Sequence, residues 1–506
     1  MTAKILEHSL TIFCAVFVFV FSWLAGHIMF ANHYGLSPVL LPFMTFVFAL
    51  PLIIGVWIAL GLGLGSGKVS ISREQGRLVL FVFMAVTFVL LIAIGYRLRF
   101  TPVWDVDALF TGGALWAETG TLVNPSKHGG TYDGYFAMFA NQLGGVFLFR
   151  CLFAVYGLFG GSDYHIAALV YNVIMLEIMV LALYDAAKRL GGVRAGVYAL
   201  FLLGIFIPFY TMGAVYYTDV LTMPFVVIAF ALYLRGREAS LLRNKTALFA
   251  ACALAATLGA VIKFTVMIVL IAVFIDYIIY NKDKWRVRLI CCGAAALVVV
   301  VTLTAFHGYI GTQLSPELVD QRRIPTTHWV MMGLQGEGAY DPGDYEFTKN
   351  LPDLATRQRE TARVALQRVG ELGPAGMYRL IRAKSLCNFS DGNYGMAGFL
   401  GTEPVFQTWM HDYVLANGKY YSTYLHISTA LVCAFYIIGI TGAALAFKKR
   451  PVSVVPFLSL FGLFVFLAFW ESGARLSLNF FPILLLSVVV AVTNFGVPGA
   501  ARPTKE

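Results

Sequence analysis

Charged residues are scarce in this chain. Of its 506 residues, Asp, Glu, Lys and Arg together make up only 13%, about half the share found in a typical soluble protein. Hydrophobic residues make up 59%. A soluble core could not bury so much apolar sequence, whereas a lipid bilayer acts as its solvent. The composition therefore argues against an ordinary soluble enzyme and predicts an all-α integral membrane protein.

Several signatures of common enzymes are also missing. The seven Cys residues form no CxxC pair, which argues against a disulfide framework or a zinc ribbon. No P-loop occurs, so ATP-driven transport has no support, and the glycine run 61–65 lacks the strand–turn–helix context of a dinucleotide site. The zinc-hydrolase HExxH pattern and the serine nucleophile elbow are absent as well. Any catalysis must therefore use other side chains.

The positions of the basic residues follow the apolar runs. A formal net charge of +10 could indicate a nucleic-acid partner, but Lys and Arg fall mainly in short gaps between apolar stretches, which is the positive-inside pattern of membrane proteins. We therefore expect membrane lipids, and no nucleic acid, as partners. Stretches of about 20 apolar residues predict roughly twelve transmembrane helices, over residues 9–31, 38–64, 78–96, 164–188, 195–214, 219–235, 246–262, 265–280, 289–309, 426–447, 452–470 and 478–495.

This arrangement predicts a multi-pass protein of the cell membrane with both termini in the cytoplasm. One stretch complicates the count, because residues 134–160 are apolar enough to resemble a further span. Counting them would move the basic residues around Lys188 to the outer side and invert every later loop. We therefore interpret 134–160 as juxtamembrane helices in the outer interface, with Arg150 reaching toward the headgroups.

Two long polar segments are expected on the outer side, about 97–163 and 311–425. The second should contain a helix over 352–372, a stop at Gly373-Pro374 and another helix over 377–386. We divide the chain into an N-terminal hairpin (1–77), a transmembrane core that includes the first outer loop (78–309), an extracytoplasmic segment (310–425) and the C-terminal helices (426–506).

Two acids follow directly on the third span. Asp105 and Asp107 lie beside Trp104 at a membrane exit, where a carboxylate can act as a general base or bind a cation. The alternative is that one of them caps the N-terminus of a helix over 108–118. The spacing does not decide between these roles.

Other charged residues stand at the same predicted side. Asp219 opens a span after Tyr216-Tyr217-Thr218 and is either a cavity acid or a helix cap. Lys263 lies within a long apolar stretch and needs an anionic partner or a wet cavity. Arg475 follows Glu471 in a tight turn and is suited either to bidentate phosphate binding or to an ion pair with that Glu.

The outer segment contains one apolar island at 327–334. It includes His328 and Trp329, which either dip toward an active cavity or help the segment pack. Asn388-Phe389-Ser390 matches the glycosylation sequon, which is a weak signal by itself.

These motifs together resemble the GT-C superfamily of polytopic glycosyltransferases, which includes the protein O-mannosyltransferases and the aminoarabinose transferases. The resemblance rests on the topology, on the juxtamembrane stretch and on five short stretches, and it covers most of the chain. The five stretches are 103–107, 187–191, 217–219, 259–265 and 471–475. The loop around His328 is most similar to Gram-positive members that modify the cell envelope. In two respects the chain departs from the pattern, because its acid follows the third span instead of the first and the His-Pro-Pro signature of the mannosyltransferases is absent.

The resemblance implies a membrane glycosyltransferase that takes a hexosyl or pentosyl group from a polyprenyl-phosphate donor, with inversion. The acceptor would be an envelope polysaccharide, a teichoic acid or a glycolipid. Asp105, with Asp107 as the competing assignment, would be the base, and Lys263 and Arg475 would bind the donor phosphate. Asp219, Glu471, His328 and Trp329 would line the cavity or contact the acceptor. Some relatives hold a divalent metal near the acid, and the sequence leaves its presence open.

A second function class shares this topology. A lipid-linked sugar flippase or a polysaccharide polymerase would also have large outer loops, but it should carry a continuous charged path through its helices. Lys263 and Arg475, both near one face, do not form such a path. A non-catalytic receptor or assembly scaffold is a third class, and it would tolerate neutralisation of Asp105 and Lys263.

Overall fold

The computed structural model describes residues 3–30, 47, 49–56, 58, 71–127, 129–281, 283–445 and 452–494. These residues are almost entirely helical. In place of strands they contain two isolated β-bridges, from Phe100 to Pro404 and from Pro125 to Thr131. The all-α fold class predicted from the composition is therefore confirmed.

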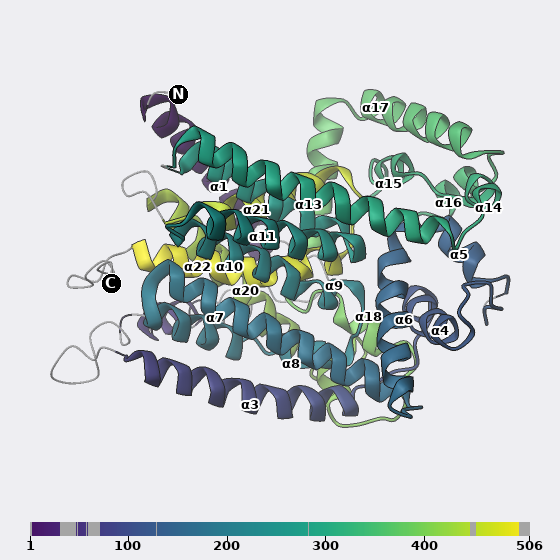
Figure 1. Ribbon diagram of the computed structural model, residues 1–506, viewed down its shortest axis with the longest axis horizontal. Coiled ribbons are helices and arrows are strands. Elements are labelled where there is room, and N and C mark those ends of the chain that lie inside the picture. Colours follow the sequence, from purple (N-terminus) through teal and green to yellow (C-terminus); the bar gives the residue numbers. More distant parts are fainter. Residues whose placement is uncertain are drawn as a thin grey trace.

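Long apolar helices run side by side and form a bundle (Figure 1). They are α1 (Ala3–Phe30), α3 (Arg73–Arg97), α7 (Tyr164–Gly204), α10 (Met223–Glu238), α11 (Leu242–Ile262), α13 (Trp285–Gly311), α20 (Tyr421–Leu445) and α22 (Phe481–Asn494), with the shorter α12 (Met267–Ile275) and α21 (Val455–Phe469). Residues of α22 lie almost wholly inside the protein, whereas α3 and α13 leave most of their apolar surface exposed. An apolar helix with no protein cover needs lipid around it, so α3 and α13 form part of the lipid-facing boundary.

Helix α7 is two helical segments that meet at Gly191 and Gly192. Gly192 has a φ of +78°, which only glycine adopts readily. A Cβ on Gly191 would lie 2.1 Å from a methyl carbon of Thr493, so this glycine allows the close approach of α22. The two segments correspond to the predicted spans 164–188 and 195–214.

The predicted spans fall on helices where the structure describes them, except that the helix of the predicted span 195–214 ends at Gly204, and a short α8 (Pro208–Thr211) and a 3₁₀ turn (Met212–Ala214) follow it. The expected span 38–64 lies mostly outside the described residues, although residues 49–56 are helical. The basic stretches around Lys68 and Lys448 and the C-terminal Arg502 and Lys505 also lie outside them. Within the described part of the chain, nine helices are long and apolar enough to cross a membrane.

One of these nine, Ala140–Leu158, lies within the segment 134–160 that we expected in the interface. It consists of a short 3₁₀ turn and α6 (Leu143–Leu158). Figure 1 shows α6 lying across one end of the bundle instead of along it. Its orientation is therefore that of a juxtamembrane helix, although its length and composition would also suit a span.

The two polar segments gather at the same end of the bundle, which we call the polar-loop end (right in Figure 1). The first contributes α4 (Trp104–Thr119), α5 (Tyr132–Met138) and α6. The second contributes α14 (Pro316–Arg322), α15 (Thr326–Met332), α16 (Pro342–Lys349), α17 (Leu354–Phe389), α18 (Met396–Leu400) and α19 (His411–Val414). Helix α17 bends at Gly373, where φ is +56°, as the Gly-Pro stop predicted. Helix α1 begins at the opposite end of the bundle, and α22 terminates there as well.

Candidate functional site

The two acids after the third span lie in the first turn of α4. That helix begins at Trp104, whose φ of +47° is unusual for a residue other than glycine, and its N-cap is Val103, which has no side-chain cap. The expectation that Asp105 or Asp107 caps a helix starting at 108 is therefore wrong. Both carboxylates instead lie where the helix dipole stabilises negative charge.

Asp107 is held by three partners. Its carboxylate accepts hydrogen bonds from Thr111 at 2.6 Å and Tyr132 at 3.3 Å, and it forms an ion pair with Lys127 at 2.8 Å. The side chain is buried. These contacts tie α4 to the loop before α5, which is the pattern of a structural anchor.

Asp105 has a different environment. One carboxylate oxygen accepts a 2.5 Å hydrogen bond from Tyr135, and the other accepts hydrogen bonds from Tyr217 at 3.3 Å and Gln142 at 3.5 Å. Gln142 also donates to the Tyr217 hydroxyl at 2.8 Å. Burial, and next the Asp105 charge, raise the pKa of Tyr135 well above its usual value, so this phenol keeps its proton. Neutral donors orient Asp105, and within the described residues it has no ion-pair partner.

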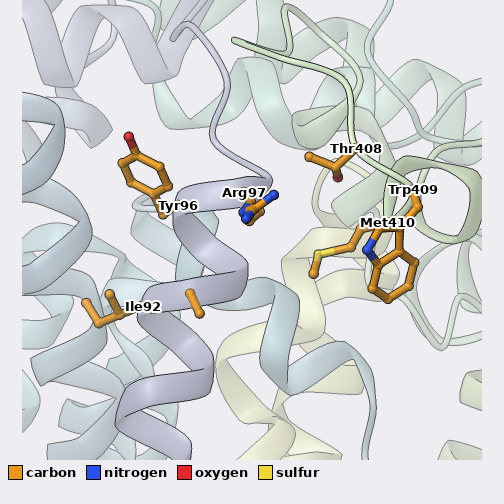
Figure 2. Close-up of a pocket in the computed structure, with 7 residues that line it drawn as sticks. Ile92, Tyr96, Arg97, Thr408, Trp409 and Met410 are labelled. Atoms are coloured by element: carbon orange, nitrogen blue, oxygen red, sulfur yellow. The ribbon is translucent and has the colours of Figure 1, made fainter.

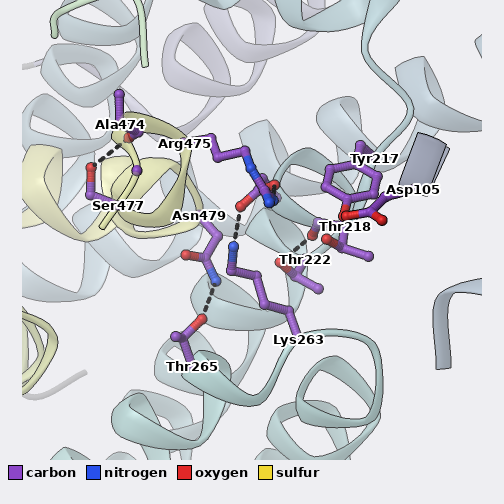
Figure 3. Close-up of polar contacts among 12 residues, drawn as sticks. Asp105, Tyr217, Thr218, Thr222, Lys263, Thr265, Ala474, Arg475, Ser477 and Asn479 are labelled. Carbon is purple, nitrogen blue, oxygen red and sulfur yellow. Dashed lines mark hydrogen bonds and ion pairs between the residues drawn. The ribbon is translucent and has the colours of Figure 1, made fainter. Parts of the chain in front are cut away.

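The three charged residues expected at the membrane face lie together (Figure 3). Asp219, in the first turn of α9 (Thr218–Leu221), is fully buried. One of its oxygens pairs with Lys263 and the other with Arg475, the latter at 3.1 Å. Asp219 is thus a buried carboxylate between two cations, and the N-cap of α9 is Tyr217 instead. The ion pair considered between Arg475 and Glu471 does not form within 4 Å in this structure.

Tyr217 joins the acid to the cations. Its hydroxyl donates to Asp105, and its ring lies 5.2 Å from the Arg475 guanidinium in a cation–π contact. Asp105, Tyr217, Arg475 and Lys263 therefore form one continuous polar site, although they come from segments up to 370 positions apart. The Arg475 side chain is one third exposed, whereas Asp219 beside it is buried.

Hydrogen bonds to other elements fix the segment that carries Arg475. This segment, η5 (Ala474–Phe480), is tied to the end of α17 because Asn388 accepts from the Gly473 amide at 2.9 Å and from the Ser477 hydroxyl at 2.7 Å. Asn479 donates to Thr265 at 3.0 Å, next to Lys263. Asn388 is buried and engaged in these bonds, so the sequon has a structural role here.

A second wall of the site comes from the outer segment. Lys384 of α17 is buried and donates to the carbonyls of Gly333, at 2.6 Å, and of Trp470. Gly333 packs so tightly against the end of α21 that a Cβ would lie 2.6 Å from the Trp470 carbonyl. The adjacent Glu471 is largely buried, which raises the pKa of its carboxyl above the usual value.

His328 and Trp329 point in different directions. The His328 ring is buried and its Nδ1 lies 2.7 Å from the Thr348 hydroxyl, inside the packing of α15 against α16. The hydroxyl proton of Thr348 is donated to the Asp344 carbonyl, so His328 Nδ1 carries the proton of their shared bond. Trp329 is half-buried and stacks on Trp470, with ring centroids 6.4 Å apart. Trp329 thus borders the site, whereas His328 helps the outer segment pack.

The residues around Asp105 do not fit a bound divalent cation. Such ions prefer several carboxylate or carbonyl oxygens, whereas the neighbours of Asp105 are two phenols and a Gln amide that donates. The oxygens of Asp107 and Asp219 already face cationic side chains. Across the described ranges, no group of three or more His, Cys, Asp and Glu side chains is placed to hold a metal.

Tyr135 and Gln142 were not predicted from the sequence as site residues, and the contact of the Tyr217 hydroxyl with Asp105 was not predicted either. Tyr217 lies in the stretch that marked Asp219, so its position was a usable signal. Tyr135 and Gln142 fall within the apolar stretch that raised the topology question. Their contact with Asp105 depends on α6 lying across the bundle.

Comparison with solved structures gives weak overall matches. ArnT from Cupriavidus metallidurans, bound to undecaprenyl phosphate, matches at 12% identity and a TM-score of 0.33, over 80% of this chain and 77% of that chain. The oligosaccharyltransferase AglB from Archaeoglobus fulgidus, in complex with an inhibitory peptide and a dolichol-phosphate, matches at 14% and 0.38, over 81% of this chain and 50% of that one. At these TM-scores, we transfer no residue role and no substrate from either protein to this chain.

Sequence comparisons identify the family. No curated protein matches the chain at a significant level. A family model described as "Conserved hypothetical integral membrane protein" matches residues 3–494, almost the whole length. The chain is therefore a member of this family of conserved integral membrane proteins.

Proposed function

We propose that this protein is a membrane glycosyltransferase that moves a sugar from a polyprenyl-phosphate donor to an acceptor hydroxyl. The observation that carries the proposal is the connection of Asp105 to the Lys263–Asp219–Arg475 cluster through Tyr217. Transfer from a lipid phosphate needs a base and a cationic site beside each other at a membrane face. The Asp105 carboxylate and two cations, one of which is the partly exposed Arg475, meet that need.

Asp105 is the proposed base. Its carboxylate takes the proton of the acceptor hydroxyl while the hydroxyl oxygen attacks the anomeric carbon. The bond from that carbon to the phosphate oxygen breaks, and its electron pair leaves with the polyprenyl phosphate. A single displacement inverts the anomeric configuration. Asp107 is less suited to this role because its side chain is fully buried and paired with the Lys127 cation, whereas Asp105 is partly exposed and has only neutral hydrogen-bond donors among the described residues.

Arg475 and Lys263 are the proposed phosphate ligands. The leaving phosphate gains negative charge in the transition state, and fixed cations in a site with little water stabilise that charge strongly. Asp219 holds both cations in place and offsets part of their charge, so that the pair remains stable while the donor is absent. A phosphate approaching from the lipid would meet the exposed edge of Arg475 first.

The acceptor side is proposed to be the wall formed by Trp329, Trp470 and Glu471. Aromatic faces beside a carboxylate suit a hydroxyl-rich substrate, because the rings cover apolar sugar faces and the carboxylate accepts hydrogen bonds from hydroxyls. The acceptor would be an envelope polysaccharide, a teichoic acid or a glycolipid.

Among the described residues, the basic Arg189 and Arg235 share the Asp185 carboxylate, and the nearby Gly191 packs on the C-terminal end of α22, at the bundle end opposite the polar-loop end (Figure 1). This placement supports an extracytoplasmic site and cytoplasmic termini.

The experiment is direct transfer by the purified protein in lipid nanodiscs. Radiolabelled undecaprenyl-phosphate sugars, hexosyl and pentosyl, are supplied with cell-envelope polymer or glycolipid. Label should pass to the acceptor fraction, and undecaprenyl phosphate should be released in equal amount. Movement of label across a sealed vesicle without transfer would instead indicate a flippase.

A further inference from the structure

A hollow lies at the end of α3 (Figure 2). None of Asp105, Lys263 and Arg475 lines it. The last turns of α3 form one side, and the segment before α19 forms the other. Its lining includes Ile92, Tyr96 and Arg97 on α3 and Thr408, Trp409 and Met410 opposite them. It encloses about 670 Å³, a size typical of sites for small molecules.

The polar part of this hollow is cationic. Arg97 is exposed and forms no ion pair with any residue that the structure describes. Nearby, Arg99 stacks on the ring of Tyr96, 4.0 Å from its centroid, and on Phe406 at 5.2 Å. The Nε–H of Arg99 is buried and has no hydrogen-bond partner among the described residues. Arg97 lines the hollow itself, and Arg99 lies behind Tyr96, to whose hydroxyl it also donates a hydrogen bond at 3.3 Å.

The apolar part continues along α3. This helix exposes large hydrophobic side chains over most of its length, among them Phe81, Val82, Val86 and Val89. Such a face lies against acyl chains in a membrane. Tyr96 and the exposed Trp409 stand where this face ends, as aromatic residues do at the headgroup level. The hollow is thus open both to lipid tails and to the interface.

We propose that the hollow binds one anionic glycerophospholipid, with its phosphate against Arg97 and Arg99 and an acyl chain along α3. A guanidinium fork matches the geometry of a phosphate diester and holds it in two hydrogen bonds. The ring faces of Tyr96 and Trp409 would enclose the glycerol region. A soluble anion would gain nothing from the apolar face of α3. The proposal does not depend on the glycosyltransferase function.

The affinity test uses the full-length protein in detergent with equimolar phosphatidylglycerol and phosphatidylcholine, followed by native mass spectrometry. The wild type should retain phosphatidylglycerol about tenfold over phosphatidylcholine, the ratio expected when one charge-assisted pair is gained. Arg97→Gln/Arg99→Gln should retain the two lipids equally. Lys284→Gln/Arg286→Gln, which removes two exposed basic residues at the start of α13, is the charge-matched control and should keep the preference.

A second measurement locates the lipid without relying on the charge variants. Phosphatidylglycerol brominated on its acyl chains quenches a tryptophan beside it, so it should quench the wild type more than the Trp409→Phe variant. Equal retention of both lipids by the wild type, or an unchanged preference in the double variant, would overturn the proposal. So would preferential retention of undecaprenyl phosphate when it is added as a competitor, or equal quenching in Trp409→Phe.

Discussion

The hydroxyl of Tyr217 donates a hydrogen bond to the Asp105 carboxylate, with 3.3 Å between the two oxygens. The same ring lies against the Arg475 guanidinium. One side chain therefore couples the proposed base to the proposed phosphate site, and changes to it separate the two roles.

Removing only the hydroxyl should weaken catalysis without abolishing it. Tyr217→Phe keeps the ring beside Arg475 but removes one hydrogen bond to the charged Asp105, a loss of about 1.5–3 kcal/mol, or roughly ten- to 100-fold in rate. The transfer rate should fall by this factor while donor affinity stays within about twofold. A fall in donor affinity as large as the fall in rate would place the hydroxyl in phosphate binding.

Asp107 should contribute to stability and not to chemistry. Asp107→Asn leaves Lys127 without its ion pair and weakens the bonds from Thr111 and Tyr132, which should cost about 1–3 kcal/mol. Thermal unfolding in detergent should show a lower midpoint, while the variant that remains folded keeps its transfer rate. An inactive variant with wild-type stability would make Asp107 the base.

Arg475 should act on the donor. Arg475→Ala removes one of the two cations near the leaving phosphate and should weaken donor binding by at least tenfold, with a small effect on the acceptor. Arg475→Lys should recover only part of this loss, because an ammonium lacks the planar fork. Binding of undecaprenyl phosphate, titrated in nanodiscs, measures the effect. Equal losses for donor and acceptor would indicate that Arg475 only holds the fold through Asp219.

His328 predicts a pH dependence of stability. Burial lowers its pKa to about 4, whereas in the unfolded chain it should titrate near 6.5. Between these values the unfolded state binds more protons, so the free energy of unfolding should fall as the pH drops from about 6.5 to 4, by at most about 3 kcal/mol. Unfolding midpoints across this range should decline less steeply in His328→Gln than in the wild type. If the unfolding midpoint declined equally steeply with pH in both proteins, His328 would not be the cause of the pH dependence.

The bundle itself was predictable from the sequence because lipid imposes its length and polarity on every span. The positive-inside pattern also predicted a juxtamembrane position for residues 134–160, whose apolar composition alone suggested a span. It could not show that α6 would bring Gln142 to Asp105. That contact depends on the angle at which α6 crosses the bundle, and the pattern of apolar residues along the sequence does not determine this angle.

The charged residues of the site were found individually, but their partners were not. Lys263 was flagged because a lysine in an apolar stretch needs an anion, and Asp219 supplies it from 44 positions away. The sequence offered Glu471 as one possible partner of Arg475, whereas in the structure the Arg475 guanidinium donates to Asp219. Asp105 and Asp107 were equivalent on spacing. Only their neighbours, Lys127 for one and Tyr217 for the other, distinguish them.

Sugar transfer by Asp105→Asn, measured beside the wild type and Asp107→Asn in the same nanodiscs, tests the central claim most directly. The substitution keeps the size of the side chain and one oxygen that can accept from a phenol, but it removes the base, so transfer should fall by about 10²–10⁴. Binding of undecaprenyl phosphate and the unfolding midpoint should stay near those of the wild type. Full transfer by Asp105→Asn would contradict the account.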